Sequence, residues 1–231
     1  MKIIENSGIC AYCKSKVEYR YGEENYLLKK KDLDNYRQYK DVYVHSCPMC
    51  NFVATNLTSK KEKEVFENIK QTAEFKDIYN YLYLKGLDKE LYDNHSQEVP
   101  ANYYESVMLS KLVSKDYEMA IRLLYKTAEL KMIMARKYRV SKAELGGEEG
   151  NDSEYIKLDK LINKSIKQNQ RQINIMYSLV KNPNIFLNLL YIENLTNMCN
   201  MAEAKREYAK LHEKTSISED LDSYIKSKIL V

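Results

Sequence analysis

The sequence predicts a mainly α-helical protein with a small β-containing segment at its amino terminus. Only six glycines and three prolines occur in 231 residues, and 44% of the residues are hydrophobic, which favours helices with few tight turns around a sizeable core. Strand-like patterns are confined to the first 57 residues. We therefore predict two parts, a head over residues 1–57 and a helical scaffold over residues 58–231.

The head contains three strand-like runs, at residues 17–21, 25–28 and 42–44. β-branched and aromatic side chains are frequent in these runs, and Gly22 and the charged residues 29–34 separate them. We predict a short strand at each run.

The scaffold begins with a long predicted helix. Ser59 and Glu62 have the spacing of a capping box, and apolar residues follow mostly at helical spacings until Gly86. Residues 101–114 and 117–142 form two further helical patterns. We expect this pair to fold as a helical hairpin.

An exposed loop is predicted at residues 144–153, where three glycines and several acidic residues cluster. Further helices are expected at residues 154–181, 185–198 and 202–212, and a final one, with its cap at residues 216–219, is expected to end at Ile229.

Four of the five cysteines form two C-x-x-C pairs, Cys10 with Cys13 and Cys47 with Cys50. A C-x-x-C turn holds two thiolates close together, so two such turns can supply the four soft ligands of a tetrahedral zinc ion. Residues 14–46 separate the pairs by more than the usual spacing, but their strand patterns fit a zinc ribbon, in which each turn lies at the tip of a hairpin. Four thiolates leave no open coordination position. We therefore predict a structural Zn²⁺ ion and not a catalytic one.

Two other interpretations of these cysteines stay open, a redox site and thiols without a metal. Neither pair directly precedes the long helix whose amino terminus would lower a thiol pKa in a thioredoxin-like site. The odd cysteine count argues against a disulfide framework. His45 could replace one cysteine as a ligand, and Cys199, in an apolar helical pattern, is expected to be a core thiol.

The motifs of the head and of the first scaffold helix occur in a recognisable order. The first C-x-x-C pair is followed by residues 39–44 (YKDVYV), 47–54 (CPMCNFVA) and 56–64 (NLTSKKEKE). This order resembles an uncharacterised bacterial family, a domain of unknown function in which a zinc-ribbon-like segment precedes tetratricopeptide-like helices. In that family a glycine often follows each C-x-x-C turn, or knuckle, whereas Lys14 and Asn51 occupy those positions here. The resemblance implies a metal-binding fold and brings no established activity.

Two helical stretches look like the second helix of a tetratricopeptide unit. Ala120 and Ala204 occupy the small position at which two helices approach closely. The two alanines are 84 residues apart, so no regular period of about 34 residues is present. Ordinary helical hairpins are the alternative interpretation.

The sequence favours a non-catalytic protein-interaction module over an enzyme. It contains no P-loop, no glycine-rich dinucleotide motif, no H-E-x-x-H and no nucleophile elbow. Catalytic candidates would be carboxylates such as Glu62 or the histidine His95, but such residues more often form a solvated helix face or a surface turn. We expect a zinc ribbon on a helical scaffold that docks a protein partner. The apolar run at residues 185–192 also leaves a homo-oligomer open.

Nucleic-acid binding is the alternative function, because zinc ribbons often serve it and two helical stretches are basic. Residues 111–142 carry nine Lys and Arg against three acidic residues, and residues 154–181 carry six against two. Such stripes can follow phosphates, with Tyr138 or Tyr177 stacking on bases. The net charge of only +4 weighs against this function. The candidate contacts are Lys126, Arg136, Lys137, Arg139, Lys164 and Arg171.

The chain is expected to be cytoplasmic and not embedded in a membrane. No apolar run approaches the roughly 18 residues that cross a bilayer, and the first residues lack the apolar segment of a secretion signal. An odd number of cysteines, which cannot all form disulfides within the chain, also suits a reducing compartment.

Overall fold

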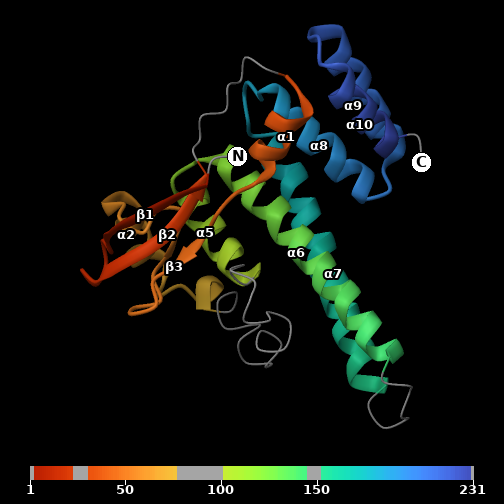
Figure 1. Ribbon diagram of the computed structural model, residues 1–231. Helices are drawn as coiled ribbons and strands as arrows, with labels where there is room; N and C mark the ends of the chain where they lie inside the picture. The colour runs from red at the N-terminus through yellow and green to blue at the C-terminus, as the bar shows by residue number, and fades with distance from the viewer. Residues whose placement is uncertain (1–2, 23–30, 77–100, 145–151, 230–231) are drawn as a thin grey trace.

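The computed structural model describes residues 3–22, 31–76, 101–144 and 152–229. Helices dominate these residues, which confirms the predicted fold class, and two small antiparallel sheets lie to one side of them (Figure 1). Among the described helices, none combines the length and apolar character that crossing a bilayer requires.

Two β-hairpins form the sheets. β1 (Ile3–Ile9) pairs with β2 (Lys16–Gly22), and the short β3 (His45–Ser46) pairs with β4 (Val53–Ala54). β2 confirms the strand predicted at residues 17–21, whereas β1 was not predicted. The run at residues 25–28 lies outside the described residues.

Residues 42–44 do not form a strand, which corrects the sequence prediction. They lie outside both sheets, and the two-residue strand β3 begins only at His45. Val42 and Val44 are both buried in the core. The alternation that suggested a strand therefore reflects alternate burial in an irregular segment.

A helix that the sequence analysis missed lies between the two hairpins. α1 (Leu33–Lys40) begins after Asp32, whose side chain accepts a hydrogen bond from the Asn35 N–H at 2.9 Å. Tyr36 and Tyr39, three residues apart on one face of α1, are buried. The overlooked signal was a capping aspartate followed by aromatic residues at helical spacing.

The long helix predicted after Ser59 is interrupted. α2 (Lys60–Ile69) begins as predicted, because the Ser59 side chain caps it by accepting the Glu62 N–H. A turn follows Ile69, and the Thr72 hydroxyl then caps a separate helical turn at residues 73–76. The rest of the predicted helix lies outside the described residues.

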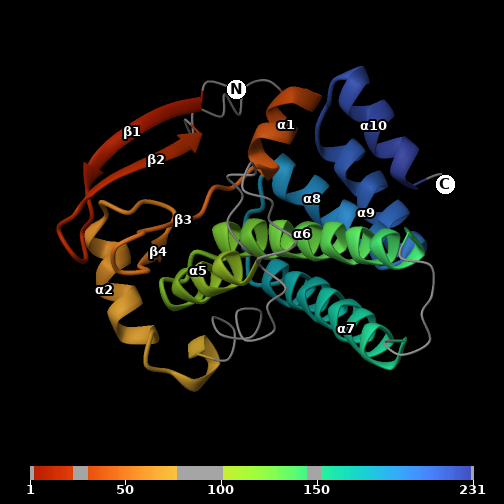
Figure 2. The same cartoon turned by 60° about the horizontal axis from the view of Figure 1, so that its bottom comes forward.

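α5 (Ala101–Val113) and α6 (Tyr117–Glu144) form the predicted helical hairpin, and α7 (Asp152–Tyr177) packs along α6 (Figure 2). α7 ends four residues before the predicted end at Lys181. The predicted exposed loop falls almost entirely on residues 145–151, which the structure does not describe.

α8 (Ile185–Asn197), α9 (Met201–Lys214) and α10 (Glu219–Ile229) match the remaining predicted helices to within a few residues. Asn184 caps α8 by accepting the Leu187 N–H at 2.9 Å. Most of the apolar side chains of α8 are buried within the chain itself and form core. These side chains are Phe186, Leu187, Leu189, Leu190, Ile192 and Leu195.

Cys199 is exposed, which corrects the prediction of a core thiol. It follows α8 with a φ of 58°, the left-handed conformation that commonly ends helices. The Asn200 N–H donates back to the Leu195 carbonyl at 2.9 Å and closes this turn. The end of α8 therefore lies one residue earlier than its apolar pattern suggested, and the thiol is at the surface.

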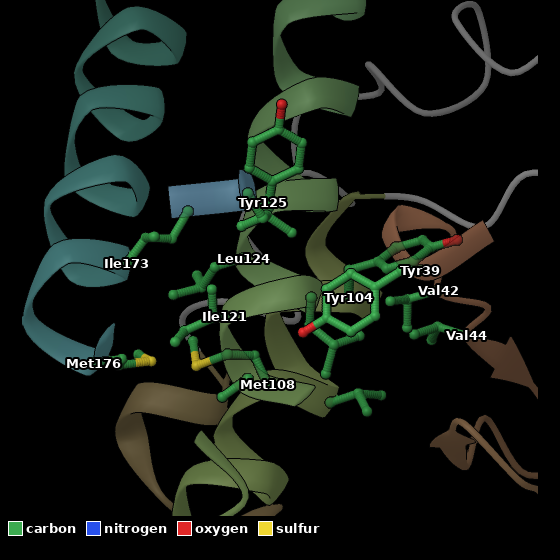
Figure 3. Packing of buried hydrophobic residues seen from close by; sticks show 14 of the residues in the cluster. Tyr39, Val42, Val44, Tyr104, Met108, Ile121, Leu124, Tyr125, Ile173 and Met176 are labelled. Atoms are coloured by element: carbon green, nitrogen blue, oxygen red, sulfur yellow. The ribbon is translucent and has the colours of Figure 1, made fainter. Parts of the chain in front are cut away.

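One hydrophobic core connects the head with the scaffold. Figure 3 shows Ile173 and Met176 of α7 on one side of Ile121 and Leu124 of α6, with Tyr39, Val42 and Val44 on the other side. The same buried cluster includes Cys10 and Cys47. The division of the chain at residue 57 remains a prediction, and metal removal tests it.

Candidate metal centre

Each C-x-x-C knuckle lies at the tip of a hairpin, as predicted. Cys10 and Cys13 lie between β1 and β2, and Cys47 and Cys50 lie between β3 and β4. The two knuckles come from segments far apart in the sequence, and the fold brings their tips together.

The two knuckles have the same backbone hydrogen bonds. The N–H of the residue after each second cysteine, Lys14 or Asn51, donates to the carbonyl of the first cysteine, at 3.0 and 2.8 Å. The N–H of each first cysteine in turn donates to a carbonyl five residues later, at 2.8 Å in the first knuckle and 2.9 Å in the second. Identical backbone turns present the thiols of both pairs in the same way.

Lys14 and Asn51 have left-handed backbones, with φ of 67° and 57°. This conformation explains why glycine suits the position, since a side chain raises the energy of a left-handed residue by about 1–2 kcal/mol, and least for Asn or Asp. Both turns form here despite the side chains.

Substitution of Lys14 by glycine is therefore expected to raise the free energy of unfolding by up to about 1 kcal/mol, because it removes this strain. Asn51→Gly should have a smaller effect, since asparagine already tolerates the conformation. Denaturant titration of the metal-loaded protein measures both differences. Lys14→Val is the control and should destabilise; a Lys14→Gly protein that is less stable than the native chain would contradict the strain argument.

The four sulfur atoms form a compact cluster. The Cys10 and Cys50 Sγ atoms are 3.9 Å apart, and those of Cys13 and Cys47 are 3.7 Å apart. All four lie within 4.8 Å of one another, and the part of the chain that the structure describes contains no other such group of metal ligands.

This spacing fits a tetrahedral metal ion. Zinc–sulfur bonds of about 2.3 Å place the corners of a tetrahedron about 3.8 Å apart, close to the Cys13–Cys47 and Cys10–Cys50 separations of 3.7 and 3.9 Å. The structure therefore contains a site that can hold one metal ion through four thiolates.

Local hydrogen bonds and burial change the thiol pKa values in opposite directions. A hydrogen bond from the Ser15 hydroxyl, 3.0 Å from the sulfur, lowers the pKa of Cys13 to about 6. Burial raises the pKa of Cys10 and that of Cys50, although backbone N–H groups that contact these sulfurs oppose the change. Metal binding thus requires loss of protons from Cys10 and Cys50, so metal affinity should increase with pH.

His45 lies two residues before Cys47 but is not part of the sulfur cluster. Its ring is largely buried, and burial lowers its pKa to about 4. It is therefore neutral at neutral pH. The four cysteines complete a ligand set without it.

Aromatic side chains pack behind the knuckles. The Tyr12 ring of the first knuckle stacks on Phe52, which follows the second knuckle, with the ring centroids 5.9 Å apart. Both rings also contact Phe66 of α2. The Ala11 N–H donates to the Leu57 carbonyl at 2.8 Å. The first knuckle is therefore attached to the segment that leads into the scaffold, independently of any metal.

The long spacing between the cysteine pairs is explained by α1, which this segment carries into the scaffold. The Tyr36 hydroxyl donates to Glu193 Oε2 of α8 at 2.6 Å, and Arg122 Nε of α6 donates to the Tyr39 carbonyl at 2.8 Å. At the start of α1, the Leu33 N–H donates to Asp220 of α10 at 3.2 Å. A metal ion between the knuckles would thus close a loop whose middle is already bound to the scaffold.

Glu193 is the centre of a buried polar cluster at this junction. Its carboxylate accepts hydrogen bonds from the hydroxyls of Tyr36 and Tyr224 and lies 3.1 Å from Lys40 Nζ. Lys40 also lies 3.8 Å from Glu129. The sequence does not reveal this cluster, because its members are distributed over α1, α6, α8 and α10.

The carboxylate considered as a catalytic candidate has a structural role. Glu62 Oε2 accepts the Thr55 N–H at 2.8 Å, and Glu62 Oε1 lies 2.9 Å from Lys111 Nζ. These contacts link β4, α2 and α5. His95, the other candidate, lies outside the described residues.

The six candidate nucleic-acid contacts differ in their exposure. Lys126 is half-buried and forms an ion pair with Glu129, with 3.9 Å between charged atoms. Arg136, Lys164 and Arg171 are exposed. The side chains of Lys137 and Arg139 are not among those described.

No family model, curated protein or solved structure matches the chain. The resemblance to the uncharacterised bacterial family therefore rests on the motifs of the sequence alone. The site defines the molecule as a mainly helical protein with a four-cysteine cluster suited to a metal ion.

Proposed function

We propose that the four cysteines hold one structural zinc ion and that the chain is a non-catalytic interaction protein of the cytoplasm. The observation that carries this proposal is the donor set, four thiols whose sulfur atoms all lie within 4.8 Å of one another. Such a set is filled by protein ligands, so a bound ion has no position for water or substrate. The ion's role is to hold the two hairpins together.

Zinc is favoured over iron, the other ion that takes four tetrahedral thiolates, because a structural role needs no redox chemistry. A colourless protein with one zinc ion per chain is expected. Visible absorption from iron bound to thiolates would support a redox centre.

Exposed apolar side chains beside the thiol cluster support a docking role. Met49, between the two cysteines of the second knuckle, is 72% exposed, and Ile9, directly before Cys10, is 56% exposed. Methionine suits binding surfaces because its flexible, polarisable side chain adapts to different apolar partners. We propose that the knuckle tips, held by the metal, present these two residues to an apolar surface of a protein partner.

The helical scaffold supports the tetratricopeptide comparison in one place. α8 and α9, with 13 and 14 residues, have lengths that suit a helix-turn-helix unit of about 34 residues, and Ala204 at their contact is fully buried. α6 and α7, with 28 and 26 residues, are too long for such a unit. These helix lengths favour one repeat-like hairpin, α8 with α9, within a larger helical scaffold.

Affinity capture from the native cell tests the docking surface. The tagged chain is expected to retain a protein partner after nuclease treatment of the lysate, and Met49→Lys should reduce the recovery of that partner at least tenfold. The reason is that a buried, unpaired lysine at an apolar contact costs several kcal/mol.

Leu179→Lys is the matched control, since Leu179 is an exposed apolar residue that follows α7 and is far from both knuckles in the sequence. It should leave the recovery unchanged. Partners that disappear after nuclease treatment, or equal recovery with Met49→Lys and the native chain, would contradict docking through the knuckle tips.

A further inference from the structure

A row of cations follows the outer face of α7. Lys160, Lys164, Lys167 and Arg171 are all exposed and are spaced by four, three and four residues, which places them on one side of the helix. We name these four residues the basic stripe. No acidic residue occurs between Lys160 and Lys181.

Several cations of the other basic stretch have partners inside the protein. Lys131 is buried and lies 2.8 Å from Glu105, and Lys111 lies 2.9 Å from Glu62. Arg122 is buried and donates to a backbone carbonyl of α1. The two stretches look alike in sequence, but much of the positive charge at residues 111–131 is neutralised or buried by the fold.

The basic stripe, in contrast, faces away from the protein. Ile162, Ile166 and Ile173 on the opposite face of α7 are buried, and α7 packs against α6 and α8. Among the ion pairs between described residues, none includes a side chain of the stripe. In Figure 1 the halves of α6 and α7 nearest residues 144 and 152 extend past the other labelled elements.

The geometry of the stripe suits a phosphate backbone. The four charges span twelve residues, and eleven steps of about 1.5 Å place them along a line of about 16 Å. Tyr177, one of the two tyrosines expected to stack on bases, is instead stacked on Tyr191, with the ring centroids 3.9 Å apart. The side chain of Tyr138, the other one, is not among those described. Contacts through phosphates alone, without base stacking, are the pattern of duplex binding without sequence preference.

A membrane surface fits less well. An amphipathic helix that binds a bilayer inserts its apolar face, whereas the apolar face of α7 is buried in the protein core. Leu161 and Ile175 are exposed beside the stripe but stand 14 residues apart, with Gln168 between them. They do not form a continuous apolar face.

We infer that the basic stripe binds the phosphate backbone of double-stranded nucleic acid without sequence preference. This activity goes beyond the proposed metal-stabilised docking role and does not depend on it. It concerns α7, one of the two basic helical stretches.

Fluorescence anisotropy with a labelled duplex of about 20 base pairs tests the inference. The full metal-loaded chain is expected to bind unrelated duplex sequences equally, with log affinity falling with log salt at a slope of about −3 to −4 for four phosphate contacts. This slope corresponds to a loss of about 100-fold in affinity between about 50 and 200 mM salt.

The variant Lys164→Gln/Lys167→Gln/Arg171→Gln should lower the affinity for duplex at least tenfold at low salt. It should also reduce the salt slope to about −1, because each lost phosphate contact reduces the size of the slope by about 1. Lys205→Gln/Lys210→Gln/Lys214→Gln on α9 is the control, since it removes the same charge from exposed positions on another helix. It should retain the native slope.

Three results would overturn the inference. The first is the absence of duplex binding at low salt, and the second is an equal loss of affinity in the two triple variants. The third is a native chain that does not bind duplex but binds vesicles of anionic phospholipid, with vesicle binding lost in the α7 variant. Unchanged far-UV circular dichroism in both variants ensures that lost binding does not reflect unfolding.

Discussion

Replacement of Cys47 by serine is expected to remove the metal ion from the purified protein and to unfold both β-hairpins. A site of three thiolates and a hydroxyl binds zinc far more weakly, and structural zinc contributes about 10–16 kcal/mol of apparent binding free energy in small domains. Loss of that contribution should lower the free energy of unfolding by more than about 4 kcal/mol, at the upper end of single-residue effects.

Three measurements on the Cys47→Ser protein check this prediction. Elemental analysis should show loss of the stoichiometric ion, hydrogen exchange should show lost protection in β1–β4, and far-UV circular dichroism should retain most of the helical signal. Cys199→Ser is the matched control, because Cys199 is an exposed thiol outside the cluster. That variant should keep its metal and its stability. A Cys47→Ser protein with full metal content and protected hairpins would contradict the four-thiolate site.

The same experiment tests the division of the chain at residue 57. If the head is a separate unit, α1 should lose protection together with the hairpins, while α5 to α10 remain folded. The contacts of α1 with Glu193, Arg122 and Asp220 connect it to the scaffold. If melting of the helices follows metal loss with the same midpoint, head and scaffold are one cooperative unit and the division is wrong.

Substitution of Glu193 by methionine should produce the second large effect, a loss of about 3–5 kcal/mol of stability. Glu193 is buried, and its removal leaves the largely buried ammonium of Lys40 with the more distant carboxylate of Glu129 and the neutral Tyr224 hydroxyl. An unpaired buried charge is costly, whereas replacing both members of a buried pair by apolar residues is often nearly neutral.

The double variant Lys40→Met/Glu193→Met should therefore recover most of the lost stability. Denaturant unfolding of the native chain, both single variants and the double variant gives the coupling free energy between the two residues. Asp34→Asn, at an exposed ion pair with Arg37, is the control and should change stability by no more than about 0.5 kcal/mol. A double variant whose loss equals the sum of the single losses would show that Lys40 and Glu193 are not coupled.

The effect of Glu193→Met should also depend on pH. Burial alone would raise the pKa of Glu193, but Lys40 and the hydroxyls of Tyr224 and Tyr36 overcome burial and lower the pKa below its ordinary value of 4.5. A carboxylate with a lowered pKa stabilises the fold above its ordinary pKa, and this contribution is lost as the pH falls through the lowered value. The stability difference between the native chain and the variant should thus shrink below pH 4.5.

Other members of the cluster act at different pH values. Burial would lower the pKa of Lys40, but Glu193 and Glu129 raise it above 10.5, so its stabilising contribution persists to neutral pH and is lost only at strongly alkaline pH. Burial raises the pKa of Glu129 above 4.5, which favours its protonated form. At acidic pH the contribution of Glu129 to stability therefore changes in the opposite direction to that of Glu193. Comparison with the Glu193 variant isolates the contribution of Glu193.

The cysteine site could be predicted because its information is local. Each C-x-x-C turn specifies its own thiol geometry, and the left-handed residues Lys14 and Asn51 stand directly after the knuckles. Helices from α5 onward could be predicted for a similar reason, since apolar periodicity and caps such as Asn184 are encoded within each segment.

Features that depend on contacts distant in sequence could not be predicted. α1 has a local capping signal at Asp32, but it is short and polar on average, and the burial of its tyrosines depends on contacts with the distant α6 and α8. The Glu193 cluster joins residues more than 150 positions apart, as in the pairs of Glu193 with Tyr36 and Lys40. The irregular segment at residues 42–44 resembled a strand because burial and strand pairing produce the same alternation of apolar side chains.

The most direct test of the metal centre is zinc analysis combined with X-ray absorption at the zinc edge of the purified chain. The account predicts one zinc ion per chain, surrounded by four sulfur atoms at about 2.3 Å. Purified protein without a stoichiometric metal ion, or a zinc ion bound by nitrogen or oxygen in place of one of the four sulfurs, would contradict it.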